Sequence, residues 1–226
     1  MLLDGARTHA YLAPMPRRVI CISRFIGAGG EEVGRRVAET LDYQLMDEEI
    51  LHHAAESSGV SVEELADAER RTKVIDGLLR NLTLAGSTAA VMSTGATAGI
   101  DYSGGNDPKS LRVLIRKSIQ ETADRGDVVI VSHAASFALS GSGDVLRVLI
   151  TASPDTRAER VAKGMAVDDK QAGKLIADSD NARAAYVKRF YGVGDELSTH
   201  YDLVLNSDSL SVELMSELVA RAAVIA

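Results

Sequence analysis

The sequence predicts an α/β protein in which helices cover both faces of a five-stranded parallel sheet. Three observations predict this fold: short continuous runs of apolar residues, helical segments between them, and a glycine-rich turn after the first run. Strands that are buried on both faces read as such runs, and helical crossovers join parallel strands. The five expected strands are Val19–Ser23, Tyr43–Met46, Asp127–Ser132, Val145–Thr151 and Tyr201–Asn206.

The first helix is expected directly after the glycine turn. Val33, Val37 and Leu41 share one helical face, and two glutamates occupy the first turn, where the helix dipole favours negative charge. The expected order is therefore strand, glycine turn, helix and second strand, and the second strand ends at Asp47.

The segment 48–126 contains no expected strand, and we interpret it as a helical insertion. Glu48–Ser58 has a helical pattern closed by Gly59, and Asp107-Pro108 is a good start for a helix that ends at Gly126. Between these helices, residues 83–107 are rich in Gly, Ser, Thr and Ala and predict a loop. The apolar stripe of 111–122 packs either in the core or against a second subunit.

The last part of the chain alternates helices and strands. Ser153-Pro154 begins a helix expected to stop at Gly164, and Asp168 begins a longer one. A final helix is expected over Leu210–Ala223. Residues 1–17 are expected to form an N-terminal extension, and residues 18–226 a single domain.

Composition restricts the partners. The chain has 226 residues and a formal net charge of −7, which makes a nucleic acid polymer an unfavourable partner. No apolar run is long enough for a membrane span, and the N-terminus lacks the pattern of a secretory signal, so we expect a cytoplasmic protein without membrane contact. Cys21 lies in an apolar run and is expected in the core.

The glycine turn, Gly27-Ala28-Gly29-Gly30, favours a bound phosphate. Glycines let backbone N–H groups approach an anion, and the following helix N-terminus adds a favourable potential. A tight connection without a ligand is the alternative. The standard phosphate loop is absent, because Gly30 and Glu31 stand where lysine and serine or threonine belong. Arg24, at the end of the first strand, is the best-placed substitute cation, unless it is an ordinary surface arginine.

Two ligand classes compete for this turn. Gly27, Gly29 and Asp47 loosely fit a dinucleotide-binding pattern, but its third glycine would fall at Glu32. That fold also expects a third strand soon after the second. A mononucleotide kinase expects an insertion there, so the sequence favours a kinase over an NAD-dependent oxidoreductase.

The segment Ile22–Gly34, with the sequence ISRFIGAGGEEVG, resembles the opening motif of the cytidylate kinase-like proteins, a family of divergent nucleoside monophosphate kinases that also lacks the lysine. Weaker similarity runs through most of residues 18–225. The resemblance implies a P-loop NTPase-like three-layer fold and phosphoryl transfer from ATP, with Mg²⁺, to a nucleoside monophosphate or similar small acceptor.

The resemblance also implies the site residues. The phosphate-binding residues would be Arg24, Gly27, Ala28, Gly29, Gly30, Glu31 and Glu32. A lid over about 157–192 would carry the catalytic arginines Arg157, Arg160 and Arg183, although a solvated helix face paired with acidic neighbours is the alternative. Asp47 would contact the acceptor or magnesium, or cap a helix.

One motif departs from the family. Ser132-His133-Ala134 stands where the family usually carries Gly-Arg-Gly, so His133 would replace an arginine at the acceptor site. A histidine is mostly neutral at pH 7 and binds phosphate more weakly. The alternative function is therefore a catalytically weak or inactive nucleotide-binding regulatory protein. Whether the chain forms a homo-oligomer stays open.

Overall fold

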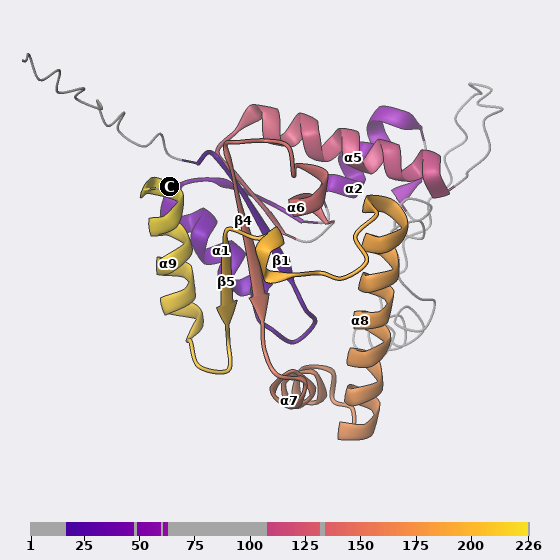
Figure 1. The fold of residues 1–226 in the computed structure, drawn as a ribbon, viewed down its shortest axis with the longest axis vertical. Coiled ribbons are helices and arrows are strands. Elements are labelled where there is room, and N and C mark those ends of the chain that lie inside the picture. Colours follow the sequence, from indigo (N-terminus) through magenta and orange to yellow (C-terminus); the bar gives the residue numbers. More distant parts are fainter. Residues whose placement is uncertain (1–16, 48, 60, 63–107, 132–133, 226) are drawn as a thin grey trace, which may run out of the picture.

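A computed structural model describes residues 17–47, 49–59, 61–62, 108–131 and 134–225 (Figure 1). The expected five strands form one parallel sheet in the order β2-β3-β1-β4-β5. Their bounds are β1 (Val19–Arg24), β2 (Gln44–Met46), β3 (Val128–Val131), β4 (Val145–Thr151) and β5 (Leu203–Asn206). The predicted fold class is confirmed. In a dinucleotide-binding sheet β2 pairs with β1, whereas here β3 lies between them.

The central strand β1 sets the register. Cys21 of β1 pairs with Ile130 of β3 on one side and with Arg147 of β4 on the other. Cys21 is fully buried, as expected, and burial raises the pKa of its thiol to about 12.

Helices cover both faces of the sheet. The bounds are α1 (Gly30–Leu41), α2 (Glu49–Ser58), α5 (Pro108–Arg125), α6 (Ala135–Ala138), α7 (Pro154–Met165), α8 (Asp169–Tyr191), the 3₁₀ helix η1 (Ser198–His200) and α9 (Val212–Ile225). One face packs against α1 and α9 through side chains such as Ile22, Val33 and Met215. The other face packs against α2, α5 and α6. The apolar stripe of 111–122 lies in this core, where its residues Ile115 and Ile119 are buried.

Element ends differ from the expected ones where side chains bind the backbone. The final helix starts at Val212, two residues later than expected, and the Ser211 hydroxyl accepts the amide of Leu214. Strand β5 starts at Leu203, two residues later than expected, and the carboxylate of the preceding Asp202 accepts the amide of Arg147 in β4. Helix α7 continues through Gly164 to Met165. The short α6 and η1 were not expected.

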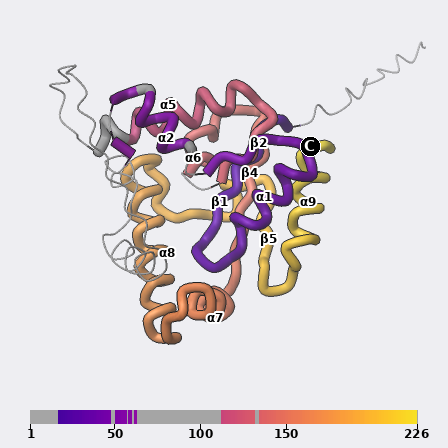
Figure 2. The backbone as a smooth tube through the Cα atoms, turned by 180° about the vertical axis from the view of Figure 1, so that it is seen from behind, coloured from indigo at the N-terminus to yellow at the C-terminus, as the bar shows by residue number. Residues whose placement is uncertain are grey.

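Helices α7 and α8 form a unit at the carboxyl end of the sheet. Figure 1 shows α7 beyond the end of β4, and Figure 2 shows the turn between β1 and α1 beside it. The two helices share a small core of their own that includes Val161, Ala172 and Ile176. The expected lid therefore corresponds to a helical pair packed on the glycine turn.

Candidate functional site: the glycine turn and its arginines

The glycine turn has the backbone that phosphate binding requires. Gly27 and Gly29 have φ angles of 78° and 84°, in the left-handed region that favours glycine, and Gly29 caps the N-terminus of α1. Ala28 donates its amide to the carbonyl of Phe25 at 3.0 Å. The amides of Gly30, Glu31 and Glu32 open α1, where N–H groups lack intrahelical acceptors. These amides are therefore suited to an anion.

Arg24 lies where the sequence predicts a cation. Its guanidinium forms an ion pair with Glu31 across the first turn of α1, with Nη2 and Oε1 2.7 Å apart. Its Nε is buried and has no hydrogen-bond partner among the described residues. An anion in the turn would compete with Glu31 for this guanidinium.

Arg160 ties α7 to the turn. Its Nη1 donates to the carbonyl of Gly27 at 3.2 Å and to the hydroxyl of Ser207 at 2.8 Å. Its Nη2 donates to the Ser207 carbonyl at 2.8 Å. Ser207 follows β5, so the sheet order already places it at the same edge as the turn. The sequence argument did not use this signal.

Phe25 brings the other two predicted arginines together. The guanidinium carbons of Arg157 and Arg183 lie 5.1 Å and 5.4 Å from the centre of its ring. Each arginine side chain is only 4% exposed. Phe25 was not predicted as a site residue, although an aromatic residue two positions before the glycine turn was a visible signal.

Each of these two arginines is held by a carboxylate. Arg157 makes a bidentate ion pair with Asp180 of α8, with distances of 2.9 Å and 2.6 Å. Arg183 binds Glu196 and the hydroxyl of Tyr201, and Tyr201 also donates to Glu196. Burial opposes the charge of Arg183, but its hydrogen bonds to Glu196 hold its pKa above the ordinary value.

The alternative for these arginines was a solvated face with acidic partners. The structure shows an acidic partner for both, in buried rather than solvated surroundings. The three predicted catalytic arginines thus lie around the turn, and two of them are paired with carboxylates, as Arg24 is with Glu31.

Of the two predicted acceptor residues, the structure describes only Asp47. Asp47 follows β2 at the same sheet edge, and its carbonyl accepts the amide of Ile50 at 3.2 Å. His133 lies outside the described residues, as do Ser132 and the loop 83–107. Among the described residues, no group of His, Cys, Asp or Glu side chains is arranged to hold a metal by itself.

Glu32 fixes the first turn of α1 to later residues. Its carboxylate accepts from Arg35 and Arg36, and Arg36 also pairs with Glu213 of α9. Hydrogen bonds from Arg35 and Arg36 lower the pKa of Glu32 to about 2. Its side chain faces these arginines, so only its amide is available to a ligand in the glycine turn.

This carboxylate gives a pH-dependent stability. Because the folded-state pKa lies below the unfolded value of about 4.3, the stabilisation is complete above that pH and disappears as the pH falls toward 2. We expect Glu32→Gln to lower the melting temperature slightly at pH 7 and not at pH 2. Thermal unfolding followed by circular dichroism between pH 7 and pH 2 measures the change in melting temperature. The control is Glu159→Gln, which alters an exposed glutamate of α7. A loss that stays constant over this range would contradict the assignment.

The comparisons with known proteins follow this geometry. A parallel sheet with a glycine turn and clustered arginines at its carboxyl edge is the arrangement typical of α/β proteins that bind phosphate groups. The model of the cytidylate kinase-like family matches residues 19–209. The chain belongs to this family, and its fold is the α/β P-loop fold.

Curated relatives match part of the chain. A cytidylate kinase of Methanopyrus kandleri is 29% identical over 113 residues, which are 46% of this chain and 58% of that protein. A cytidylate kinase of Staphylothermus marinus is 31% identical over 109 residues, 48% of this chain and 60% of that protein. These matches span less than two thirds of either relative.

A solved structure supports the fold over nearly the whole chain. An uncharacterized protein of Eubacterium ventriosum superposes with a TM-score of 0.62 at 17% identity, covering 91% of this chain and 97% of that one. Among the helices of the described residues, none combines the length and apolar character that a bilayer span requires.

Proposed function

We propose that the protein transfers a phosphoryl group from ATP to a nucleoside monophosphate of the cytidylate type. The observation that carries the proposal is the glycine turn, which presents the first amides of α1 beside Arg24 and Arg160. Phosphoryl transfer depends mainly on positioning and on stabilising charge, so amides and guanidinium groups can supply what the missing lysine would. The matched cytidylate kinases support the same reaction class.

Each group has a proposed part. The amides of Gly30, Glu31 and Glu32 bind the phosphates of ATP. Arg24 gives up its ion pair with Glu31 and binds a phosphate oxygen in its place. Arg160 holds α7 against the turn, while Arg157 and Arg183 bring positive charge to its rim. The acceptor contacts Asp47 and His133. We also propose that the protein works in the cytoplasm.

The residues around the turn could hold Mg²⁺ only if the phosphates of the nucleotide supply part of its ligands. Magnesium is usually held by one or two carboxylates, several waters and the substrate phosphates. Asp47, at the edge of the sheet, supplies such a carboxylate. When bound, the ion would neutralise charge on the transferred phosphoryl group.

A coupled assay of ADP release tests the proposal. We expect turnover with CMP, and comparison with dCMP, UMP, AMP and GMP ranks the acceptors. The absence of ADP release with every one of these acceptors would overturn phosphoryl transfer.

Gly29→Val tests the turn itself. Among the described residues, no atom outside its chain neighbours lies within 4 Å of a Cβ at Gly29, so the added side chain enters the space proposed for phosphate. We expect kcat/KM to fall by about 10²-fold, the size of effect seen when one donor to a charged transition state is lost. The measurement is the same ADP-release assay.

Gly192→Val is the matched control for this substitution. Gly192 has a φ angle of 70° and is equally open, but it caps α8 away from the turn. Both variants therefore carry the same kind of backbone strain. Equal activity in the two variants would contradict phosphate binding at the turn.

The second candidate is a nucleotide-binding regulatory protein without turnover. The burial of Arg157 and Arg183 favours it, because each is already neutralised by a carboxylate. Calorimetry distinguishes the two candidates: heat of ATP binding without ADP release supports the regulator, and rapid ADP release rules it out.

A further inference from the structure

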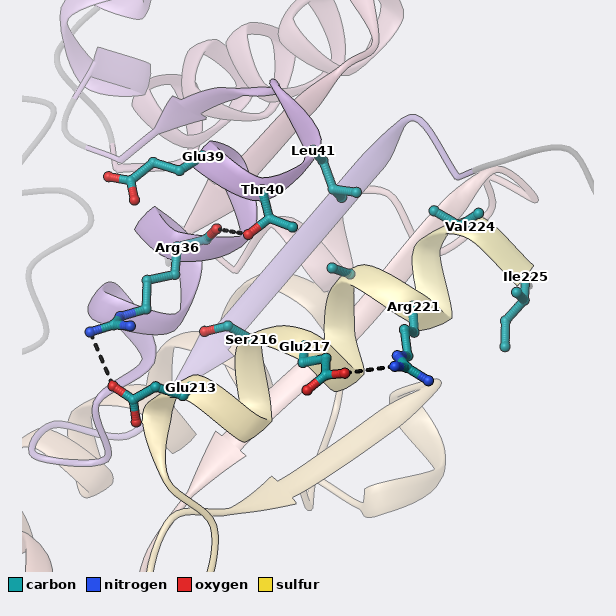
Figure 3. A pocket seen from close by; sticks show the side chains of 11 residues that line it. Arg36, Glu39, Thr40, Leu41, Glu213, Ser216, Glu217, Arg221, Val224 and Ile225 are labelled. Atoms are coloured by element: carbon teal, nitrogen blue, oxygen red, sulfur yellow. Dashed lines mark hydrogen bonds and ion pairs between the residues drawn. The ribbon is translucent and has the colours of Figure 1, made fainter.

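A groove lies between α1 and α9, on the side of the molecule that the proposed phosphate site does not use. Figure 3 shows its lining, and its volume is about 680 Å³. Leu41 of α1 and Val224 and Ile225 of α9 gather at one end of it. Val224 is 50% exposed and Ile225 is 70% exposed. This apolar end is therefore open to a further group.

The charged side chains that line the groove are held in ion pairs. Arg36 pairs with Glu213 at 3.1 Å, and Arg221 pairs with Glu217 at 2.7 Å. Glu39 pairs with Arg35. An occupant without charge can therefore cover the apolar end and leave these ion pairs intact. A strongly charged occupant would have to break them.

The chain enters the described structure at this end of the groove. The amide of Arg17 donates to the carbonyl of Ala223 in the last turn of α9, at 2.7 Å. The hydroxyl of Tyr43, just after α1, donates to the carbonyl of Arg17 at 3.4 Å. Arg17 is thus held between the ends of the two helices that line the groove. Figures 1 and 2 both show the start of β1 beside the C-terminal end of α9.

The residues that precede Arg17 match the groove in chemistry. Residues 10–16 read Ala-Tyr-Leu-Ala-Pro-Met-Pro and carry no charged side chain. Pro14 and Pro16 disfavour a helix and favour an extended segment. An extended chain spans about 3.3 Å per residue, so from Arg17 this segment can reach well along α9, which rises about 1.5 Å per residue.

We propose that residues 10–16 bind in the groove between α1 and α9, with Tyr11, Leu12 and Met15 as the apolar contacts. The bound segment covers Val224 and Ile225 and links the N-terminal extension to the two helices on this face of the sheet. The proposal is independent of the proposed catalytic activity, since it uses none of the phosphate-site residues.

Disulfide trapping in the full-length chain tests the proposal. The variant Ala13→Cys with Glu217→Cys places one thiol in the segment and one in the groove, further along α9 from the contact of Arg17 with Ala223, where an extended segment would bring Ala13. Cys21 is fully buried and does not compete. The control is Ala13→Cys with Asp144→Cys, because Arg17 also contacts the carbonyl of neighbouring Gly143, on a side away from the groove. Mass spectrometry and sedimentation measure the rate of cross-linking and whether the bond joins one chain or two.

Binding predicts an intrachain bond to Glu217→Cys that forms at least about tenfold faster than the bond to Asp144→Cys, because docking raises the effective concentration at the groove. Adding Leu12→Asp should reduce the rate to that of the control. Equal rates for the two pairs would overturn the proposal, and so would no effect of Leu12→Asp. A bond between two chains would overturn it as well and would identify a second copy as the occupant.

Discussion

Arg183→Ala is expected to lower the free energy of unfolding by about 3–5 kcal/mol, the usual cost of removing one partner of a buried ion pair. The substitution removes the guanidinium that pairs with Glu196, whose side chain is 13% exposed. It also removes a hydrogen bond to Tyr201 and the cation above Phe25. Urea unfolding followed by far-ultraviolet circular dichroism measures the loss.

Arg221→Ala is the matched control. Arg221 also pairs with a glutamate, but its side chain is 73% exposed, so we expect a loss below about 1 kcal/mol. The double variant Arg183→Leu with Glu196→Leu should recover most of the stability, because apolar pairs often replace buried ion pairs at little cost. A loss in Arg183→Ala no larger than in Arg221→Ala would show that the buried pair stabilises nothing.

This expectation changes how kinetic data on the arginines should be interpreted. A loss of turnover in Arg183→Ala can reflect the loss of folded structure around Phe25 as well as the loss of a catalytic charge. Gly29→Val does not have this ambiguity, because its added side chain meets open space and its strain is matched by Gly192→Val.

The sheet could be predicted from the sequence because its signals are local. Each strand is a short apolar run, and β4 was predicted with both of its ends correct. The start of β5 could not be predicted because it depends on a distant partner, whereas the start of α9 follows a local contact of Ser211 with Leu214. Asp202 is held by Arg147, 55 positions earlier, and no local pattern shows that contact.

The candidate site also combines local features, which the sequence predicts, with contacts between distant residues, which it does not. The glycine turn and the cation at Arg24 follow from residue types next to a strand end. The pairing of Arg157 with Asp180 and of Arg183 with Glu196 depends on how α7 and α8 fold back on the turn. Phe25 gains its role only when two distant guanidinium groups meet over its ring. Sequence spacing placed the arginines on helices but could not show their burial.

Gly27→Ala is expected to lower the free energy of unfolding by about 2–5 kcal/mol, from left-handed backbone strain and from crowding in a packed contact. A Cβ at Gly27 would lie 2.8 Å from the carbonyl oxygen of Arg157 and 3.1 Å from its Cα. These are atoms of α7, so relief requires the helix to move away from the turn. Such a movement would also strain the bond from Arg160 to the Gly27 carbonyl.

Gly29→Ala separates the two causes, since Gly29 has a similar φ angle of 84° and an added Cβ there meets no atom within 4 Å in the part of the chain that the structure describes. We expect it to cost only the backbone strain, about 1–2 kcal/mol. Urea unfolding of both variants gives the difference, which measures how closely α7 packs on the turn. Equal losses would mean that α7 can withdraw freely, as a hinged lid would. A larger loss at Gly27 would mean that the turn and the helix carrying Arg157 and Arg160 form one packed unit, so that closure over a nucleotide would have to come from other parts of the chain.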